Sequence, residues 1–257
     1  MKTCKEFYDM IKENVHTEKS VAIIQIGNDH ASARYARNKA NDLESIGAYV
    51  SIFNYEEGIE LDILHRSIML NCMNHDAIMI MEPFPQLYEP IIRPILKAFD
   101  NKNLDRISCT AHGIMSWLKW NEYDLTGKNI TIIGRSHLVG KPLAQLMTDA
   151  NATVTLCHSH TPANKLVCHC LASDVVVSAA GQAGLIHQNM VQPTCLVIDV
   201  GINMRDGKLV GDCEPNIVGL PAMDPRLRGA RLGYQTPVPG GVGLLTRAQV
   251  MLELSNM

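Results

Sequence analysis

Short, nearly continuous apolar runs alternate along this chain with longer segments of helical periodicity. The runs are rich in Val and Ile and are five or six residues long. They cover residues 21–26, 77–81, 129–133, 153–157, 174–178 and 195–200. Apolar runs of this kind, separated by helical segments, are typical of parallel strands that are covered on both faces. The pattern therefore predicts an α/β fold built on parallel sheets.

The same pattern indicates where the chain divides. The polar stretch 121–128 precedes the third predicted strand, and we place a boundary there. It separates a first α/β domain of residues 1–120 from a second of residues 121–243, which we expect to be a doubly wound sheet. Leu and Val recur on one helical face near the end of the chain, so a C-terminal helix is expected. We expect residues 244–257 to complete the first domain.

Composition narrows the class of protein. The chain has 257 residues, of which 46% are hydrophobic and 19% charged, so it can bury a sizeable core in about two domains. Its net charge is −3 and neither half is basic, which argues against a nucleic-acid partner. No apolar run reaches the roughly 18 residues that a membrane span needs. The first residues lack the apolar stretch of a signal peptide, so we expect a cytoplasmic protein.

The eight cysteines do not form the framework of a small secreted domain, and we expect reduced thiols. One cluster offers zinc-ligand types, with Cys157, His158 and His160 followed by Cys168–Cys170. Its spacing is not that of a zinc finger or ribbon, and Cys157 ends an apolar run. Ordinary core and loop positions are the favoured interpretation, with no metal.

The third predicted strand leads into a glycine-bounded loop and then a helical pattern. A strand, a tight glycine turn and a helix start direct backbone N–H groups at a phosphate, as in a Rossmann-type dinucleotide site. Ser136 stands where the G-x-G-x-x-G motif has its second glycine, so a plain turn of an α/β protein stays an alternative. The candidate cofactor residues of this loop are Gly134, Arg135, Ser136, Val139 and Gly140.

The following strands supply further candidates. In NAD-binding units an acidic residue typically ends the next strand and binds the ribose hydroxyl. Here that strand ends without a carboxylate, whereas Ser159 and Arg135 can donate hydrogen bonds to a 2′-phosphate, which favours NADP over NAD. Ala180, Gly181 and Ile202 follow the last two predicted strands, at the end where cofactors bind, although ordinary loop residues also occur there.

In the first domain, Tyr35 and Lys39 are separated by four residues in a helical pattern and so share a face. A lysine acts as an acid or base once burial or neighbours shift its pKa, and a tyrosine ring offers a surface for stacking. The alternative is a solvated lysine beside a half-buried tyrosine.

Seven segments together form one ordered set of motifs: 26–39, 82–85, 134–142, 157–161, 199–203, 207–212 and 236–243. This set resembles the signatures of the methylenetetrahydrofolate dehydrogenase/cyclohydrolase family. The resemblance extends over most of the chain, and its most specific parts are 134–142 and 236–243. It implies one-carbon chemistry on tetrahydrofolate with NADP, a folate cleft between two α/β domains, and a homodimer.

The resemblance also implies roles for single residues. Lys39 would be the central catalytic lysine, Tyr35 would stack on the folate ring, and Asp105 would hydrogen-bond the pterin. The segment that would line the folate and nicotinamide side consists of Pro237, Val238, Pro239, Gly240 and Gly241.

Several positions depart from the family pattern, among them residues 106–109, since only Asp105 of the segment 103–109 matches the family. Met81 stands where the family has a glutamine that would also contact substrate and tune the lysine, and a thioether is a weak acceptor that donates nothing. Glu82 replaces an apolar residue, and a carboxylate near Lys39 would favour the ammonium form, a poor general base. We therefore predict an NADP-dependent oxidation of 5,10-methylenetetrahydrofolate to 5,10-methenyltetrahydrofolate, with weak or absent cyclohydrolase activity.

Three alternatives stay open. A fully bifunctional enzyme would need a rearranged lysine site. A degenerate, non-catalytic relative that binds NADP would have no physical need to keep Lys39, Tyr35 and Asp105. A general Rossmann dehydrogenase for a small alcohol or acid would leave both the lysine–tyrosine pair and the segment 236–243 unexplained.

Overall fold

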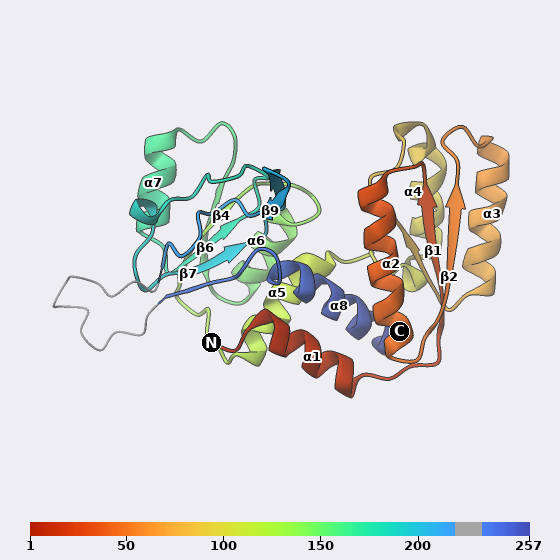
Figure 1. Ribbon diagram of the computed structural model, residues 1–257, viewed down its shortest axis with the longest axis horizontal. Coiled ribbons are helices and arrows are strands. Elements are labelled where there is room, and N and C mark those ends of the chain that lie inside the picture. Colours follow the sequence, from red (N-terminus) through yellow and green to blue (C-terminus); the bar gives the residue numbers. More distant parts are fainter. Residues whose placement is uncertain (219–232) are drawn as a thin grey trace. The chain divides into compact units, whose positions relative to one another are not determined.

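The protein is described by a computed structural model over residues 1–218 and 233–257 (Figure 1). It divides into two compact units. One comprises Asp9–Cys109 with Arg247–Met257 and is called the three-stranded unit here. The other comprises Met1–Tyr8 with Thr110–Thr246 and is called the five-stranded unit. The domain limits expected from the sequence, residues 1–120 with 244–257 and residues 121–243, stay a prediction.

The three-stranded unit is built on a parallel sheet of order β2-β1-β3. Its strands are β1 (Ser20–Ile26), β2 (Tyr49–Tyr55) and β3 (Ala77–Ile80). Its main helices are α2 (His30–Ser45), α3 (Leu61–Asn74) and α4 (Glu89–Ala98), with short 3-10 turns at Gln86–Tyr88 and Asp100–Lys102. Six of the seven residues of β1 are buried, as expected for a central strand with both faces covered.

Alternation along the strands decides which side chains meet which helix. Ile24 of β1 and Ile78 of β3 face the same side and pack with Leu64 of α3 and Ile92 of α4 in one core cluster. Met79 points to the opposite side, where its sulfur meets a side chain of α2. The α2 face of the sheet is therefore separate from its aliphatic core, and α2 and α3 lie on opposite sides of the strands (Figure 1).

The five-stranded unit carries an all-parallel sheet of order β10-β7-β6-β4-β5. Its elements are β4 (Asn129–Ile133), α6 (Gly140–Asp149), β5 (Thr153–Cys157), α7 (Ala163–Leu171), β6 (Val175–Ser178), a 3-10 turn at Gln188–Met190, β7 (Leu196–Asp199) and β10 (Tyr234–Gln235). A separate antiparallel pair consists of β8 (Asn203–Arg205) and β9 (Lys208–Val210). The chain crosses back over β4 between β5 and β6, which is the doubly wound arrangement.

Three further helices lie at the limits of the two units. They are α1 (Cys4–Asn14), α5 (Cys109–Trp120) and α8 (Val242–Asn256). Within the five-stranded unit, Gly113 of α5 approaches the backbone of Leu245 so closely that an added Cβ would lie 2.4 Å from its carbonyl oxygen. Within the three-stranded unit, Lys19 donates a hydrogen bond to the carbonyl oxygen of Leu254. Across the described ranges, no helix is both long and apolar enough to cross a membrane.

The predicted α/β fold with parallel sheets is confirmed. All six predicted strands exist, with ends that differ by no more than one residue from the expected ones. The sequence missed β2, because exposed and partly buried residues alternate irregularly there, in the order exposed, intermediate, exposed, exposed. It also missed β8, β9 and β10, which are two or three residues long and too short for a periodic signal.

Candidate functional site

All five strands of the five-stranded sheet end at one edge, which we call the carboxyl edge. The loop after each strand carries one group of the sequence-predicted cofactor and folate residues. They are Gly134–Gly140 after β4, Ser159 after β5, Ala180 and Gly181 after β6, Ile202 after β7, and Pro237–Gly241 after β10. In open α/β sheets, ligands bind at this edge, so the fold brings these residues together where a cofactor is expected.

The loop between β4 and α6 depends on its two glycines. Gly134 has φ +112°, and a Cβ there would lie 2.2 Å from the carbonyl oxygen of Ala179. A Cβ on Gly140 would lie 1.9 Å from the carbonyl oxygen of Gly134. Only glycine therefore lets the loop fold back on itself and approach the loop after β6 at the point where the chain reverses its direction across the sheet.

The start of α6 carries the positive end of a helix dipole, although Lys141 N–H already donates to the carbonyl oxygen of Ser136 at 3.0 Å and Pro142 has no N–H. Its cap residue, Val139, provides no side-chain hydrogen bond, and the hydroxyl of Ser136 accepts from the Val139 N–H at 3.1 Å. The first amides of a helix point outward and carry the positive end of its dipole. Residues 135–138 are exposed. This loop therefore presents the features that a dinucleotide phosphate needs.

The turn after β5 presents Ser159 to solvent. His158 N–H donates to the hydroxyl of Thr161 at 3.0 Å, and Thr161 N–H donates back to the carbonyl of His158 at 2.8 Å. This closed turn leaves Ser159 exposed at the carboxyl edge, and Arg135 is exposed on the loop that follows the neighbouring strand β4. Hydroxyl and guanidinium donors without an acidic residue in the turn suit a 2′-phosphate.

The loop after β10 has a defined shape. The Val238–Pro239 peptide bond is cis, Gly240 has φ +94°, and a Cβ on Gly241 would lie 2.2 Å from the carbonyl oxygen of Pro237. The loop borders a pocket of about 270 Å³, which Thr236, Pro237 and Val238 share with Asp199. The beginning of the predicted segment 237–241 therefore forms one wall of this pocket at the end of the sheet.

In the three-stranded unit, α2 brings Tyr35 and Lys39 together. The helix begins after Asp29, whose carboxylate accepts from the Ser32 N–H at 2.6 Å. The Lys39 side-chain nitrogen lies 5.0 Å from the centre of the Tyr35 ring. Lys39 is only 6% exposed, so the alternative of a solvated lysine is wrong.

Asp105 reaches the same place from another part of the chain. Asn103 and Ile78 form an isolated parallel bridge beside β3, and Leu104 N–H donates to the carbonyl of Ile78 at 2.9 Å. This extension of the sheet carries Asp105 to Lys39, and the lysine nitrogen lies 3.6 Å from one carboxylate oxygen. The structure therefore assembles Tyr35, Lys39 and Asp105 into one cluster, which we call the lysine cluster.

Competing influences decide the charge of Lys39. Burial by itself lowers the pKa of a lysine, but the Asp105 carboxylate, assisted by Tyr35 and Cys109, more than offsets it and raises the pKa of Lys39. Burial raises the pKa of Tyr35, and it raises the pKa of the Cys109 thiol to about 12. At neutral pH the cluster therefore contains an ammonium group, a neutral phenol and a neutral thiol.

Two details of this cluster differ from the sequence prediction. The thioether that contacts Lys39 belongs to Met79, whose sulfur lies 3.1 Å from the lysine nitrogen. Met81 is buried two residues further along the same face. The idea that Glu82 raises the pKa of Lys39 is wrong. Its carboxylate pairs with Arg93 at 3.0 Å, and the carboxylate that acts on the lysine is Asp105.

Sequence reasoning missed Met79 and Cys109 as neighbours of Lys39. A signal for Met79 existed, because residues two apart on a strand share a face and Met81 had already been singled out. No signal existed for Cys109, which packs beside the cluster through the turn after Asp105 and whose thiol lies 3.4 Å from the carbonyl oxygen of Leu104.

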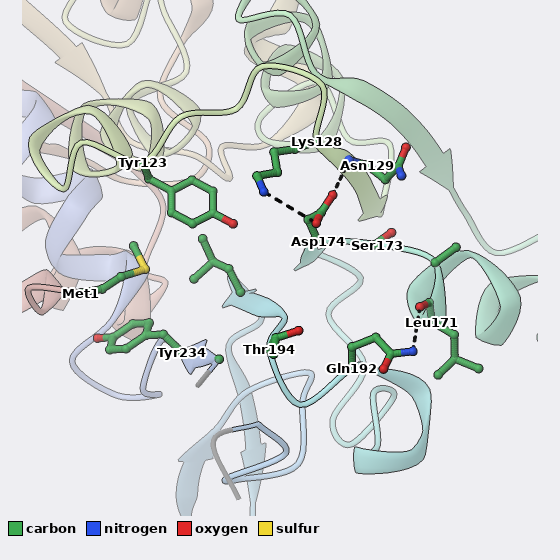
Figure 2. A pocket seen from close by; sticks show the side chains of 13 residues that line it. Met1, Tyr123, Lys128, Asn129, Leu171, Ser173, Asp174, Gln192, Thr194 and Tyr234 are labelled. Carbon is green, nitrogen blue, oxygen red and sulfur yellow. Dashed lines mark hydrogen bonds and ion pairs between the residues drawn. The ribbon is translucent and has the colours of Figure 1, made fainter. Parts of the chain in front are cut away.

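Another cavity of the five-stranded unit contains none of the candidate site residues. It has about 610 Å³ and lies at the opposite end of the strands, beside Asn129 and the Lys128–Asp174 pair (Figure 2). Tyr123 and Tyr234 line it from different segments (Figure 2). Because ligands of such sheets bind at the carboxyl edge, size alone does not make this cavity the candidate site. Within the described ranges, no group of three His, Cys, Asp or Glu side chains could hold a metal ion.

A doubly wound parallel sheet with a glycine loop and a helix start at its carboxyl edge defines a nucleotide-binding α/β protein. Comparisons with known proteins narrow this class. Residues 108–257 match the family described as "Tetrahydrofolate dehydrogenase/cyclohydrolase, NAD(P)-binding domain". The "Bifunctional protein FolD" of Macrococcus caseolyticus is 37% identical over 249 residues, which cover 90% of this chain and 84% of that protein. The chain belongs to the tetrahydrofolate dehydrogenase/cyclohydrolase family.

Solved structures agree with this assignment. The bifunctional FolD enzyme of Campylobacter jejuni has a TM-score of 0.79 and 28% identity, with 98% of this chain and 94% of that chain covered. The enzyme of Trypanosoma brucei, which was solved with NADP and an inhibitor, has a TM-score of 0.80 and 25% identity, with 98% and 93% covered. The expected family is therefore confirmed over nearly the whole chain.

Proposed function

We propose that this protein oxidises 5,10-methylenetetrahydrofolate to 5,10-methenyltetrahydrofolate with NADP. The observation that carries the proposal is the carboxyl edge, where the Gly134–Gly140 loop, the dipole of α6 and exposed Ser159 suit an NADP dinucleotide. Family membership supplies the substrate class, since the relatives are named as dehydrogenase/cyclohydrolases acting on this folate.

Within this proposal the chain mainly binds and orients. NADP, when bound, accepts a hydride, and a transfer between two rings depends chiefly on their mutual placement. We assign Tyr35 to stacking on the folate ring and Asp105 to hydrogen bonding with the pterin. We assign Pro237–Gly241 to the folate and nicotinamide side. We assign Ile202, which is 68% exposed after β7, to an apolar contact with the cofactor.

The positive charge of Lys39 limits the cyclohydrolase activity. Hydration of the methenyl cation requires a proton to leave the attacking water, and a group that accepts it must be unprotonated. Asp105 holds Lys39 as an ammonium, and Met79 offers it only a weak acceptor. We therefore propose that Lys39 acts as a hydrogen-bond donor and that cyclohydrolase activity is weak.

The comparisons do not support this finer part of the proposal, because the relatives are named as bifunctional. It depends on the lysine cluster of this chain alone.

A two-wavelength assay tests both the dehydrogenase activity and the weak cyclohydrolase activity. Purified protein receives methylenetetrahydrofolate with NADP, and NADPH formation is followed. In a separate reaction, the decay of added methenyltetrahydrofolate is measured with and without protein. We expect NADPH formation with little accelerated decay. Comparable rates in both would contradict the weak cyclohydrolase, and silence in both would favour a non-catalytic relative that binds NADP.

The same proposal includes NADP in preference to NAD, on the basis of Arg135 and Ser159. Equal activity with both cofactors would contradict it. A homodimer is a further expectation taken from the family resemblance, and light scattering on the purified protein measures it directly.

A further inference from the structure

A buried carboxylate lies beneath the loop that follows β6. Asp212 is fully buried, and its two oxygens accept five hydrogen bonds. One oxygen accepts from the hydroxyl of Ser178 at 3.1 Å, from Ala180 N–H at 2.7 Å and from Gly181 N–H at 3.1 Å. The other accepts from Gln182 N–H at 2.8 Å and from the amide of Asn203 at 3.0 Å.

A second aspartate fixes the position of Asp212. The carboxylate of Asp199, at the end of β7, accepts from the N–H groups of Asp212 and Cys213, each at 2.9 Å. A Cβ on Gly201 would lie 2.0 Å from the Asp212 carboxylate, and a Cβ on Gly211 would lie 1.9 Å from that of Asp199. Both carboxylates therefore pack against glycine backbone and have a single place to lie.

These contacts turn three backbone amides of the loop after β6 towards the interior. The N–H groups of Ala180, Gly181 and Gln182 all point inward to Asp212, although these residues are exposed. Successive amides that converge on one point form an anion-binding nest. Here the chain fills that nest with its own carboxylate. The loop after β6 thus has none of these three donors left for a phosphate. The other candidate at this edge is the exposed loop 135–138, with the dipole of α6 behind it.

We propose that Asp212 is a positioning residue for the cofactor. It fixes the loop 180–182 and, by occupying its amides, directs the phosphates of the dinucleotide to the Gly134–Gly140 loop. The loop after β6 is then left for the uncharged nicotinamide-riboside part, which its exposed backbone can contact. This inference rests on the proposed function, since it assumes that NADP binds at the carboxyl edge.

The test uses Asp212→Asn, which keeps the shape of the side chain. The substituted amide would turn an N–H towards the N–H groups of Ala180 and Gly181, so the loop has to shift. Two ligands are titrated by protein fluorescence: NADP, which spans the site, and 2′,5′-ADP, which lacks the nicotinamide mononucleotide half, including one of the two bridging phosphates. We expect the Kd for NADP to rise at least tenfold and the Kd for 2′,5′-ADP to change less than twofold.

Asp174→Asn is the matched control. Asp174 belongs to the same unit, and its carboxylate accepts a hydrogen bond from the backbone N–H of Asn129 at 2.9 Å. It lies at the opposite end of the strands from Asp212. We expect this variant to bind both ligands as the original protein does. If Asp212→Asn does not fold, Ser178→Ala removes a single donor to the same carboxylate and is expected to raise the Kd for NADP two- to fivefold.

The outcomes separate the two proposals. An unchanged Kd for NADP in folded Asp212→Asn protein would overturn the positioning role. So would an equal loss of both ligands, because a general structural defect would weaken both. If the original protein bound neither ligand, the proposed function would be overturned first, and this inference with it.

Discussion

At the scale of single residues, the chemistry of the lysine cluster depends on which group Lys39 contacts. Its side-chain nitrogen lies 3.6 Å from a carboxylate oxygen of Asp105 and 3.1 Å from the sulfur of Met79. The sequence was sufficient to select Tyr35, Lys39 and Asp105. It was not sufficient to exclude Glu82, because only the fold shows that Arg93 binds this carboxylate.

The charge of Lys39 gives the first prediction. In the Asp105→Asn variant the carboxylate that raises the pKa of Lys39 is gone, while burial, which lowers it, remains. The pKa should therefore fall. If the ammonium is the active form, the loss of kcat/KM at high pH should begin at least one pH unit lower than in the original protein.

Glu82→Gln is the control for this pH profile. It also removes a carboxylate from the same unit, but one that pairs with Arg93 rather than with Lys39. Its profile should match that of the original protein. An unshifted profile for Asp105→Asn would show that Lys39 does not determine the limb at high pH.

The methionines give a second prediction. Met81→Gln introduces an amide oxygen on the face of β3 that meets Lys39, and an amide accepts hydrogen bonds far better than a thioether. We expect the hydration of methenyltetrahydrofolate to rise at least fivefold, as measured by its decay. Met79→Leu, which keeps the volume, should change this rate less than threefold. No gain from Met81→Gln would point to residues 106–109 as the cause of weak hydrolysis.

At the scale of elements, α2 carries three polar residues on the face that is turned away from solvent. Tyr35, Lys39 and Asp42 are spaced by four and three residues and so share one helical face. Asp42 is 3% exposed and pairs with the guanidinium of Arg247 in α8, within the three-stranded unit. The sequence predicted both helices, but it gave no sign that Asp42 and Arg247, which are far apart along the chain, hold them together.

This ion pair gives a third prediction. Asp42→Asn leaves a partly buried guanidinium without its charged partner, which is expected to cost about 3 kcal/mol of unfolding free energy. Urea unfolding of the purified protein measures this. Glu89→Gln breaks a pair with Arg93 in which both side chains are nearly half exposed, and it should cost less than about 1 kcal/mol. Equal effects of the two variants would contradict the difference in burial.

At the scale of the whole molecule, the thiols report how the chain is packed. All eight cysteines are free, and Cys168 is the exposed one. Burial raises the pKa of the others for which a shift is found, to about 12 for Cys4, Cys170 and Cys195. Sequence reasoning favoured free thiols. It could not tell which one is exposed, because Cys168 and Cys170 differ only in the face of α7 on which they lie.

The fourth prediction follows from this distribution. A thiol reagent such as dithionitrobenzoate should react quickly with one cysteine of the native protein and with eight in concentrated guanidinium. Cys168→Ser should remove the fast reaction. Several fast equivalents in the native protein would contradict the burial of the remaining thiols.

The sequence predicted most of the carboxyl edge because one rule, that loops after parallel strands meet, gathers distant residues without knowledge of their contacts. It could not predict Asp212, because the residues whose amides it binds are about thirty positions away and carry no pattern of their own. Contacts made by backbone amides leave little trace in side-chain identity.

The packing of two carboxylates against two glycines also restricts how this sequence can drift. A methyl group at Gly201 would displace the carboxylate of Asp212, and one at Gly211 would displace that of Asp199. A larger residue at either glycine should therefore be tolerated only when the aspartate that faces it is also changed. In a library with these four positions randomised, surviving clones should change Gly201 only together with Asp212, and Gly211 only together with Asp199.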